Sequence, residues 1–577
     1  SVTGSALNSY IESSEITFTD FEGGNISISG AEYRLNDSDW TEAGTATLKN
    51  GDTLMLRVIA SNLYNTKVTS LVAGSTWSFE FSVTTIENGE LVMIMEKELS
   101  EDGSTVINGR KELIFKFSES MQINSLELSG GMLPDCNDHS DKVSCLNLDW
   151  SENHSILVVS PKENFYWYSD MRSLDVNIAG DSLAQLNKVL KATVLPVFKT
   201  FQPADVVIGQ SSFMTPFEGT NSTQLDSPTS VNISKQGDNE ILLVTDSTNS
   251  RILKYDSVPT SNREEHTSRF GQSTSTSKNR GDSAGMLNYP HTAIAHNDRV
   301  YIADSSNRRA VWLDWENFNS GEGEEYGQAT SLVGQSYFDQ APSLLCRQSG
   351  LNYTKGTEVV DTDSGIKWLV SDSYQSRILI WSNPGEALGV DADLVLGQSN
   401  FDDCSESSSA TLGLASISSP RGIWSNGEKL VVVSASENRL LVWNSFPTVN
   451  NQTPDFQLGQ EDDVSNSANA GTGASNLNQR GFYQPNGIGG NSHQICVADQ
   501  YNNRVLIWSE LPENSDDLAD VVIGQVNFTS KYNWSVDEKS LNYPASCDIS
   551  MEQLFIADKN NNRVLIYNAL NKRPTNN

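Results

Sequence analysis

The sequence has no apolar run of the ~20 residues that a membrane-spanning helix needs, and it is poor in basic side chains. Its 577 residues include 39 Lys and Arg against 73 Asp and Glu, a formal net charge of −34. Such acidity repels nucleic acid and anionic lipid unless a basic patch offsets it, and no Lys/Arg run is present. We therefore expect no nucleic-acid partner, no membrane-spanning segment and a soluble extracellular surface.

Cysteine is also scarce: six are present, none with the Cys-x-x-Cys spacing of a metal site. Cys136 and Cys145 bracket a polar loop, so their spacing predicts a loop-closing disulfide and an oxidising compartment. The other four leave alternatives open: Cys346 with Cys404 as a possible pair, and Cys496 with Cys547 as a pair or two buried thiols.

What the sequence does contain, after residue 200, is a two-part phrase repeated six times. The first part is an acidic turn that leads into an apolar run beginning with Arg, as in 246–255. The second is a short apolar run that ends in Gly-Gln, first at Gly209-Gln210, and the six copies are 62 to 65 residues apart. A fixed period with four short apolar runs per unit predicts a closed ring of blades.

Each unit reads as four strands, which we call a to d from the inside of the ring outward. In the fifth unit the expected strands are 487–489, 494–498, 504–508 and 520–524, rich in Val and Ile and bounded by Asn, Gly, Pro and Asp. The last unit lacks its own strand d, whereas one extra Gly-Gln strand, 205–208, precedes the first unit. We expect that strand to be the outer strand of blade 6 and to close the ring.

Residues 205–567 resemble the six-bladed propellers built from NHL repeats. The resemblance rests on the Pro-x-Gly-Ile starts at 420–423 and 485–488 and on the Asn-Asn-Arg-Val-Leu turns at 502–506 and 561–565. Blade 4 departs from it, because 434–436 reads Ser-Ala-Ser in place of the acidic turn.

The recurrent Asp and Arg admit two interpretations, a functional ring of charge or a structural staple. A residue pair needed in every blade is typical of a structural repeat, so we expect the Asp that ends strand b to bind the Arg that opens strand c. Since blade 4 lacks that Asp, replacing Arg439 should cost less stability than replacing Arg377.

The first 200 residues predict two β-sandwiches, 1–86 and 87–200, ahead of a propeller domain at 201–577. Strand-like runs at 26–29, 53–58 and 77–83 alternate in polarity. The phrases at 28–33, 50–54 and 81–85, and in the second module 113–121, 148–161 and 174–180, resemble the Ig-like repeats of bacterial surface proteins. The expected fold is all-β: two Ig-like sandwiches followed by a six-bladed propeller closed by an N-terminal outer strand.

No catalytic set or cofactor is expected. Some relatives of NHL propellers are zinc-dependent lyases, but the six histidines do not supply three at equivalent blade positions. A calcium site in the channel would need carboxylates beside Asn486, and no other strand a begins with Asp or Glu. The Gly-x-Ser-x-Gly elbow and the Gly-rich phosphate loop are absent too.

One candidate binding site follows from the ring. The position after the Pro that opens strand a should face the channel mouth, and in blades 1 to 6 it is Thr229, His291, Lys355, Arg421, Asn486 and Ala545. His291, Lys355 and Arg421 are consecutive around the ring and could hold a carboxylate, sulfate or phosphate, with Asn486 beside them. The alternative is that these cations pair with loop carboxylates or face water.

Long connections of 19 to 26 residues from each Gly-Gln to the next strand a should cross the same face, where binding usually occurs. We expect a secreted or cell-surface, non-enzymatic binding or assembly protein whose propeller face takes a protein, a glycan or another copy of itself. For a glycan, Tyr483, Tyr532 and Trp534 are candidate contacts. The alternative is a propeller hydrolase or lyase that acts at the channel mouth.

Overall fold

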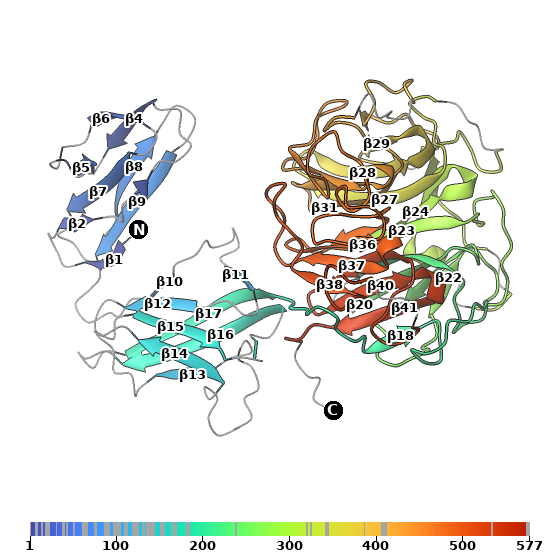
Figure 1. Ribbon diagram of the computed structural model, residues 1–577, viewed down its shortest axis with the longest axis horizontal. Coiled ribbons are helices and arrows are strands. Elements are labelled where there is room, and N and C mark those ends of the chain that lie inside the picture. Colours follow the sequence, from blue (N-terminus) through green and yellow to red (C-terminus); the bar gives the residue numbers. More distant parts are fainter. Residues whose placement is uncertain are drawn as a thin grey trace. The chain divides into compact units, whose positions relative to one another are not determined.

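The computed structural model describes residues 196–572 apart from 237–238, 319–320, 324–325, 341–345, 386, 405–411 and 532–534, and before residue 196 chiefly the strands. The chain divides into two compact units, Ser1–Leu195 and Pro196–Asn577 (Figure 1). In the described part, no helix is long and apolar enough to cross a membrane.

The first half of unit 1 contains two sheets. One is ordered β1 (Val2–Ser5), β9 (Ser78–Thr85), β8 (Lys67–Ala73), β4 (Gly24–Ser29) and β6 (Gly44–Leu48). The other contains β2 (Tyr10–Glu12), β7 (Thr53–Ile59) and β3 (Ile16–Thr17), with β5 (Glu32–Leu35) also paired to β7. Leu54 and Leu56 of β7 are fully buried, so this strand turns every second side chain into a core.

The second half of unit 1 repeats this plan. One sheet is ordered β10 (Met93–Met95), β12 (Leu113–Phe117), β15 (Ile156–Pro161) and β14 (Leu146–Trp150). The other is ordered β11 (Thr105–Asn108), β17 (Gln185–Leu195), β16 (Asp170–Ala179) and β13 (Glu127–Ser129). In both halves an early strand runs parallel to the last strand, β1 to β9 and β11 to β17. Cys145 is buried and disulfide-bonded, and its expected partner Cys136 lies outside the described residues.

Unit 2 is a six-bladed β-propeller, as the repeat predicts, and every blade is a four-stranded antiparallel sheet. Blade 1 is β19 (Pro228–Gln236), β20 (Asn239–Asp246), β21 (Arg251–Tyr255) and β22 (Ser268–Phe270); blade 2 is β23 (Pro290–His296), β24 (Arg299–Asp304), β25 (Arg309–Asp314) and β26 (Ser331–Val333); blade 3 is β27 (Thr354–Thr362), β28 (Gly365–Asp372), β29 (Arg377–Ser382) and β30 (Leu394–Leu396). Blade 4 is β31 (Pro420–Ser425), β32 (Leu430–Ser434), β33 (Arg439–Trp443) and β34 (Phe456–Leu458); blade 5 is β35 (Ile488–Gly490), β36 (Ile495–Asp499), β37 (Arg504–Trp508) and β38 (Val521–Ile523); blade 6 is β39 (Pro544–Ile549), β40 (Gln553–Asp558), β41 (Arg563–Asn568) and β18 (Val206–Ile208).

The ring closes through β18, as expected. This strand pairs antiparallel with β41, and Val207 lies opposite Leu565. All three residues of β18 are buried. A strand from the start of the unit therefore completes the last blade and leaves no open edge there.

The core of the propeller lies between blades. Six clusters of buried apolar side chains each combine residues from two neighbouring blades, so the clusters follow the ring all the way round. In the cluster between blades 5 and 6, Cys496 of β36 forms a disulfide with Cys547 of β39. Cys346 and Cys404, which follow the outer strands of blades 2 and 3, form another. Both pairings that the sequence left open are therefore present.

Candidate functional site

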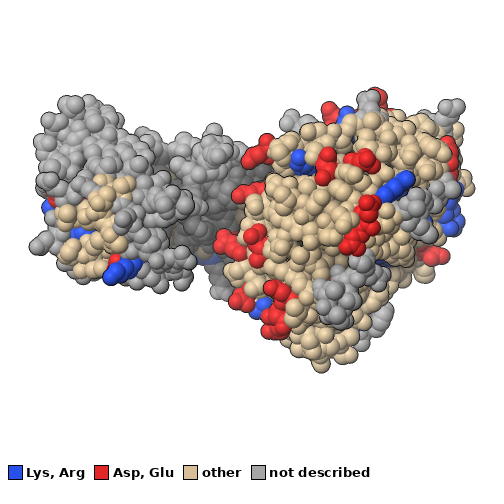
Figure 2. Space-filling model, turned by 90° about the horizontal axis from the view of Figure 1, so that it is seen from above, with Lys and Arg blue, Asp and Glu red and all other residues tan. Residues whose placement is uncertain are grey.

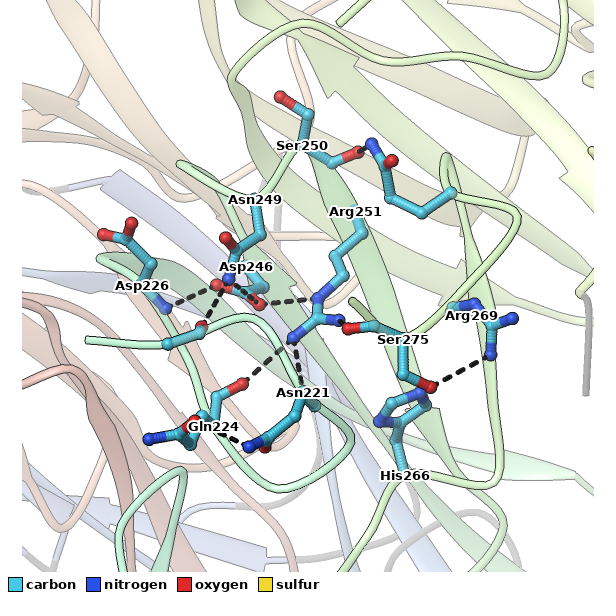
Figure 3. Close-up of polar contacts among 12 residues, drawn as sticks. Asn221, Gln224, Asp226, Asp246, Asn249, Ser250, Arg251, His266, Arg269 and Ser275 are labelled. Carbon is cyan, nitrogen blue, oxygen red and sulfur yellow. Dashed lines mark hydrogen bonds and ion pairs between the residues drawn. The ribbon is translucent and has the colours of Figure 1, made fainter. Parts of the chain in front are cut away.

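The recurrent Asp and Arg form buried staples in five blades. In blade 1, Arg251 Nε donates to Asp246 Oδ2 at 2.7 Å, and neither side chain is exposed to solvent (Figure 3). Blades 2, 3, 5 and 6 repeat the pair at 2.7 to 2.9 Å. The Asp also accepts a hydrogen bond from Asn249 two residues before the Arg, and from the backbone N–H of Asp226. The structural interpretation of these residues is therefore correct.

Each staple Arg also fixes the loops of the long-loop face, meaning the face formed by the d–a connections and the b–c turns. Arg251 donates to the backbone carbonyls of Asn221 and Gln224, in the connection before its blade (Figure 3). It donates as well to the carbonyl of Ser275, in the connection after it. Arg504 does the same with Gly481 and Phe528. In five blades the guanidinium thus holds two successive long loops on one rigid turn. In blade 2 the three carbonyls that Arg309 binds all lie in the connection before its blade.

Blade 4 corrects one expectation. Its Arg439 does have a buried acidic partner, Glu437, at 3.0 Å, with side chains 0% and 2% exposed. Ser434, which replaces the usual Asp, donates its hydroxyl to the same carboxylate at 2.7 Å. The longer Glu side chain, placed two residues before the Arg, reaches the position that the Asp occupies elsewhere. A weaker staple in blade 4 is therefore not expected.

The Gly-Gln pair at the end of strand d contacts the same b–c turn. The six glycines have φ between +85° and +109°, a conformation that disfavours any side chain. At Gly524 an added Cβ would lie 2.9 Å from the Asn503 carbonyl oxygen. Gln525 then donates its side-chain amide to that same carbonyl at 3.0 Å. Glycine is needed so that strand d can end against the b–c turn, and glutamine caps that turn.

The b–c turn of one blade positions the start of the next. In five blades this turn is one turn of 3₁₀ helix that ends in a left-handed residue. The side chain of Asn503, the left-handed residue of blade 5, accepts the backbone N–H of Tyr543 at 2.8 Å. Asn438 accepts the N–H of Gln484 at 2.7 Å in the same way. In five blades the residue directly before strand a is also left-handed, and in blade 5 the same holds for the residue before Pro485. These residues have φ of +49° to +62°: Ser227, Tyr289, Tyr353, Ser419, Gln484 and Tyr543.

The six innermost strands enclose a central cavity of about 140 Å³. Of the predicted site residues, His291 and Asn486 line it, together with Thr229 and Ala545. The neighbours Gly356 and Gly422 line it in blades 3 and 4. Lys355 and Arg421, one residue earlier in their strands, therefore lie at the mouth.

The structure brings Lys355 and Arg421 together and adds Lys559, from the b–c turn of blade 6. Burial, with the nearby charges of Arg421 and Lys559, lowers the pKa of Lys355 to about 7. Burial and then the charge of Arg421 also lower the pKa of Lys559. Among the described residues, no carboxylate forms an ion pair with any of these three cations. We call Lys355, Arg421 and Lys559 the cationic cluster.

Arg421 is held by neutral acceptors. Its Nη2 donates to Gln484 Oε1 at 3.0 Å, and its Nη1 donates to Gln500 Oε1 at 3.3 Å and to Asn486 Oδ1 at 3.5 Å. Its Nε is buried and has no partner. Amides fix the orientation of the guanidinium without neutralising its charge.

His291 lies at the mouth but does not contribute to its positive charge. Burial, and then the charges of Lys355, Lys559 and Arg421, lower the pKa of this imidazole well below its usual value. Near neutral pH it is an uncharged ring whose Nδ1 is buried and has no hydrogen-bond partner. The expected cationic arc of His291, Lys355 and Arg421 thus needs one change, since Lys559 supplies the third charge.

Sequence reasoning missed Lys559 because only strand a was compared between blades. The first residue of each b–c turn is Ser247, Ser305, Ser373, Ala435, Gln500 and Lys559 in blades 1 to 6. In blades 5 and 6 this residue lies beside Arg421. Comparing this second position would have found both Lys559 and Gln500.

Acidic groups lie deeper in the cavity, where Glu358 and Asp548 contribute to the lining. Burial raises the pKa of Glu358 well above its usual value, and the neighbouring Asp548 adds to the effect. Burial also raises the pKa of Asp548 to about 7, although four N–H donors oppose the rise. No group of three or more His, Cys, Asp or Glu in the described part is placed to hold a metal ion.

The outer surface has the opposite charge to the mouth. Figure 2 shows Asp and Glu spread over the visible side of the larger unit, with few Lys and Arg among them. The cationic cluster is therefore a local exception on an acidic molecule.

No family model matches the chain, and no curated protein matches it significantly. Among solved structures, a protein of unknown function from Bacteroides thetaiotaomicron is similar over 82% of this chain and 98% of its own, with 11% identity and a TM-score of 0.39. A putative oxidoreductase (glucose dehydrogenase) from Thermus thermophilus is similar over 60% and 98%, with 12% identity and a TM-score of 0.32. A chain of the nidogen/laminin complex is similar over 46% and 73%, with 15% identity and a TM-score of 0.26. At these scores the similarities carry no inference about ligand or activity.

Proposed function

We propose that this chain is a secreted or cell-surface binding protein without catalytic activity, whose propeller recognises an anionic group at the channel mouth. The observation that carries the proposal is the cationic cluster. Three like charges lie together in a partly buried site. The lowered pKa values of these groups reflect the free-energy cost of keeping them charged there. An anion would relieve that cost, and strongly perturbed groups of this kind cluster at functional sites.

The proposed extracellular location rests on the disulfides and on the negative net charge. Two disulfides join segments of the propeller, and Cys145 of unit 1 is disulfide-bonded too. Disulfides persist in oxidising compartments, and a net charge of −34 suits a soluble extracellular surface. We further propose that the propeller is of the NHL type and that unit 1 consists of two Ig-like spacer or docking modules. The parallel pairing of an early strand with the last strand in both halves of unit 1 supports a common module.

Binding of simple anions tests the proposal. Citrate, sulfate and inorganic phosphate should each raise the melting temperature of the propeller at constant ionic strength, relative to chloride. Arg421→Gln should reduce the apparent affinity at least about tenfold. Arg480→Gln is the matched control, because Arg480 lies on the same face but pairs with the exposed Asp516. If none of these anions stabilises the parent protein, or if both variants behave alike, the proposal is wrong.

The alternative is a propeller hydrolase or lyase, and Glu358 is the observation that favours it. Burial raises the pKa of this carboxyl well above its usual value, which favours the protonated form that a general acid needs. The nearby Asp548 is a poor second catalytic group, because it accepts hydrogen bonds from Asn232, Ile233, Gly490 and Ile549. Mass spectrometry of a bound ligand after prolonged incubation decides the matter: turnover that Glu358→Gln abolishes would establish an enzyme.

A further inference from the structure

We infer that the ligand of the channel mouth is a glycan whose terminal sugar carries a carboxylate. The inference rests on the proposed function, because the cationic cluster would bind the carboxylate. It adds a sugar ring, for which separate residues provide the contacts.

Tyrosines surround the cationic cluster. Tyr289, Tyr353 and Tyr543 directly precede strands a, whereas Tyr374 and Tyr501 lie in b–c turns. Tyr353, Tyr501 and Tyr543 all lie close enough to Arg421 to influence its pKa. A set of aromatic rings around one guanidinium offers flat apolar faces next to a positive charge.

The rings are arranged in two groups. In blade 3, Tyr353 and Tyr374 stack with centroids 4.6 Å apart and planes 13° apart, and Lys355 Nζ lies 5.6 Å from the centre of the Tyr353 ring. Tyr374 is 59% exposed, so its outer face is open. In blades 5 and 6, Tyr501 packs against Tyr543 at 4.7 Å and against Tyr483 at 5.0 Å. Tyr483, a sequence-predicted glycan contact, thus belongs to this set, and the other two, Tyr532 and Trp534, lie outside the described residues.

The positions of these tyrosines are fixed before a ligand arrives. Tyr289, Tyr353 and Tyr543 have left-handed backbones, where glycine would cost least, and yet carry large side chains. The Asn503 side chain holds the backbone N–H of Tyr543. Rigid aromatic side chains contribute contact area at low entropic cost, which is the property a preorganised site needs.

Hydrogen-bonding groups complete the mouth. Gln484 and Gln500 use their oxygens for Arg421, and among the described residues neither amide nitrogen has an acceptor. Those NH₂ groups can bind the hydroxyls of a sugar. Aromatic faces pack against the C–H face of a pyranose ring, amides bind its hydroxyls, and cations bind its carboxylate.

The charge distribution limits the ligand further. Nucleic acids, acidic peptides and densely charged polysaccharides bring many negative charges, which a chain of net charge −34 repels everywhere outside the mouth. The cavity below the mouth is lined by the carboxyls of Glu358 and Asp548, which offer no positive charge to a second anionic group. A single carboxylate on an otherwise neutral glycan meets both conditions. The cavity below the mouth is lined by residues from all six blades, a shape that suits the end of a glycan chain.

Titration calorimetry with defined ligands tests the inference. 3′-Sialyllactose and a glucuronic-acid-terminated disaccharide are the acidic probes, lactose is the neutral probe, and acetate and tetraglutamate are anions without a sugar. At least one acidic sugar should bind about tenfold or more tightly than lactose, acetate and tetraglutamate. Tyr374→Ala should remove most of that advantage and leave citrate binding unchanged, because Tyr374 is exposed and contributes no charge. Tyr337→Ala, which changes an exposed tyrosine of the β26–β27 connection, is the control and should bind as the parent does.

The outcomes separate this inference from the proposed function. If citrate binds in an Arg421-dependent way but no acidic sugar exceeds acetate, the sugar inference is wrong and the anion site stands. If tetraglutamate binds as tightly as the sugars and Tyr374→Ala has no effect, the partner is an acidic peptide. If lactose equals the acidic sugars, the carboxylate has no role. If no probe binds, both the inference and the proposed function fail.

Discussion

Replacing Glu437 by Ala should destabilise the propeller as strongly as removing the Asp of a regular blade. Glu437 is the only acidic partner of Arg439 among the described residues, and both side chains are buried. Backbone carbonyls of Asp463, Gly413 and Ser416 hold the guanidinium in place, so it cannot move into water when the carboxylate is removed. The substitution therefore leaves a buried, uncompensated cation.

The magnitude follows from that geometry. Removing one partner of a buried ion pair costs about 3–5 kcal/mol. The Ser434 hydroxyl also loses the shorter of the two hydrogen bonds that it donates and keeps the one to the Ser418 carbonyl at 3.4 Å. We therefore expect about 4 kcal/mol, which is also the expectation for Asp372→Ala in blade 3. For a unit of this size 1 kcal/mol corresponds to roughly 1–2 °C, so the midpoint should fall by about 4–8 °C.

Differential scanning calorimetry of the full chain measures that midpoint. Glu428→Ala is the control, since Glu428 is exposed in the β31–β32 turn of the same blade and should shift the midpoint by less than about 1 °C. If Glu437→Ala shifts the transition no more than Glu428→Ala does, Glu437 is not the partner of Arg439. A shift far below that of Asp372→Ala would likewise restore the expectation of a weak staple in blade 4.

Four further predictions concern the mouth, the ring closure and a disulfide. Binding of a carboxylated ligand should weaken as pH rises through about 7, where Lys355 loses its proton, and Lys355→Arg should flatten the profile measured by calorimetry. For the same reason, the ligand-free protein should gain stability as pH rises above about 7, because the unfolded chain then binds more protons at this lysine. A chain that begins at Phe213 should melt below one that begins at Phe201, because it lacks β18 and three buried residues. Serine at both Cys346 and Cys404 should cost about 4 kcal/mol in denaturant titrations, since the bond spans 58 residues.

Each of these has a contrary result. A pH profile that is unchanged in Lys355→Arg would mean that another group titrates at the mouth. Equal melting of the two truncated chains would contradict closure by β18. A double serine variant as stable as the parent would show that the disulfide restrains loops which are already held by the staple arginines.

The sequence was most informative where the six units agree. The period and the closing strand were predicted, and the strand boundaries of blade 5 were predicted to within one residue, because repetition averages out the ambiguity of any single short apolar run. In blade 5, for example, β37 spans Arg504–Trp508, as expected. Lys355 and Arg421 were also placed together from their blade positions alone.

The sequence did not predict the residues at which one blade differs from the others. Glu437 lies three positions later than the Asp that it replaces, so an alignment of repeats reports only a missing acid. Lys559 and the tyrosines lie at positions that vary from blade to blade, since they serve the mouth and not the fold. The charge state of His291 depends on burial between strands, which no spacing reveals.

The two ends of the propeller meet. Leu570 donates its backbone N–H to Val197 at 2.8 Å, and Val197 donates to Asn571 Oδ1 at 2.9 Å, just before β18 joins β41. Tension applied between the two ends would therefore pass through a short seam in blade 6, and blades 1 to 5 would carry little of it. A protein that anchors a cell or a fibre through unit 1 could bear mechanical load there while the mouth, formed at the other end of strands a, keeps its shape.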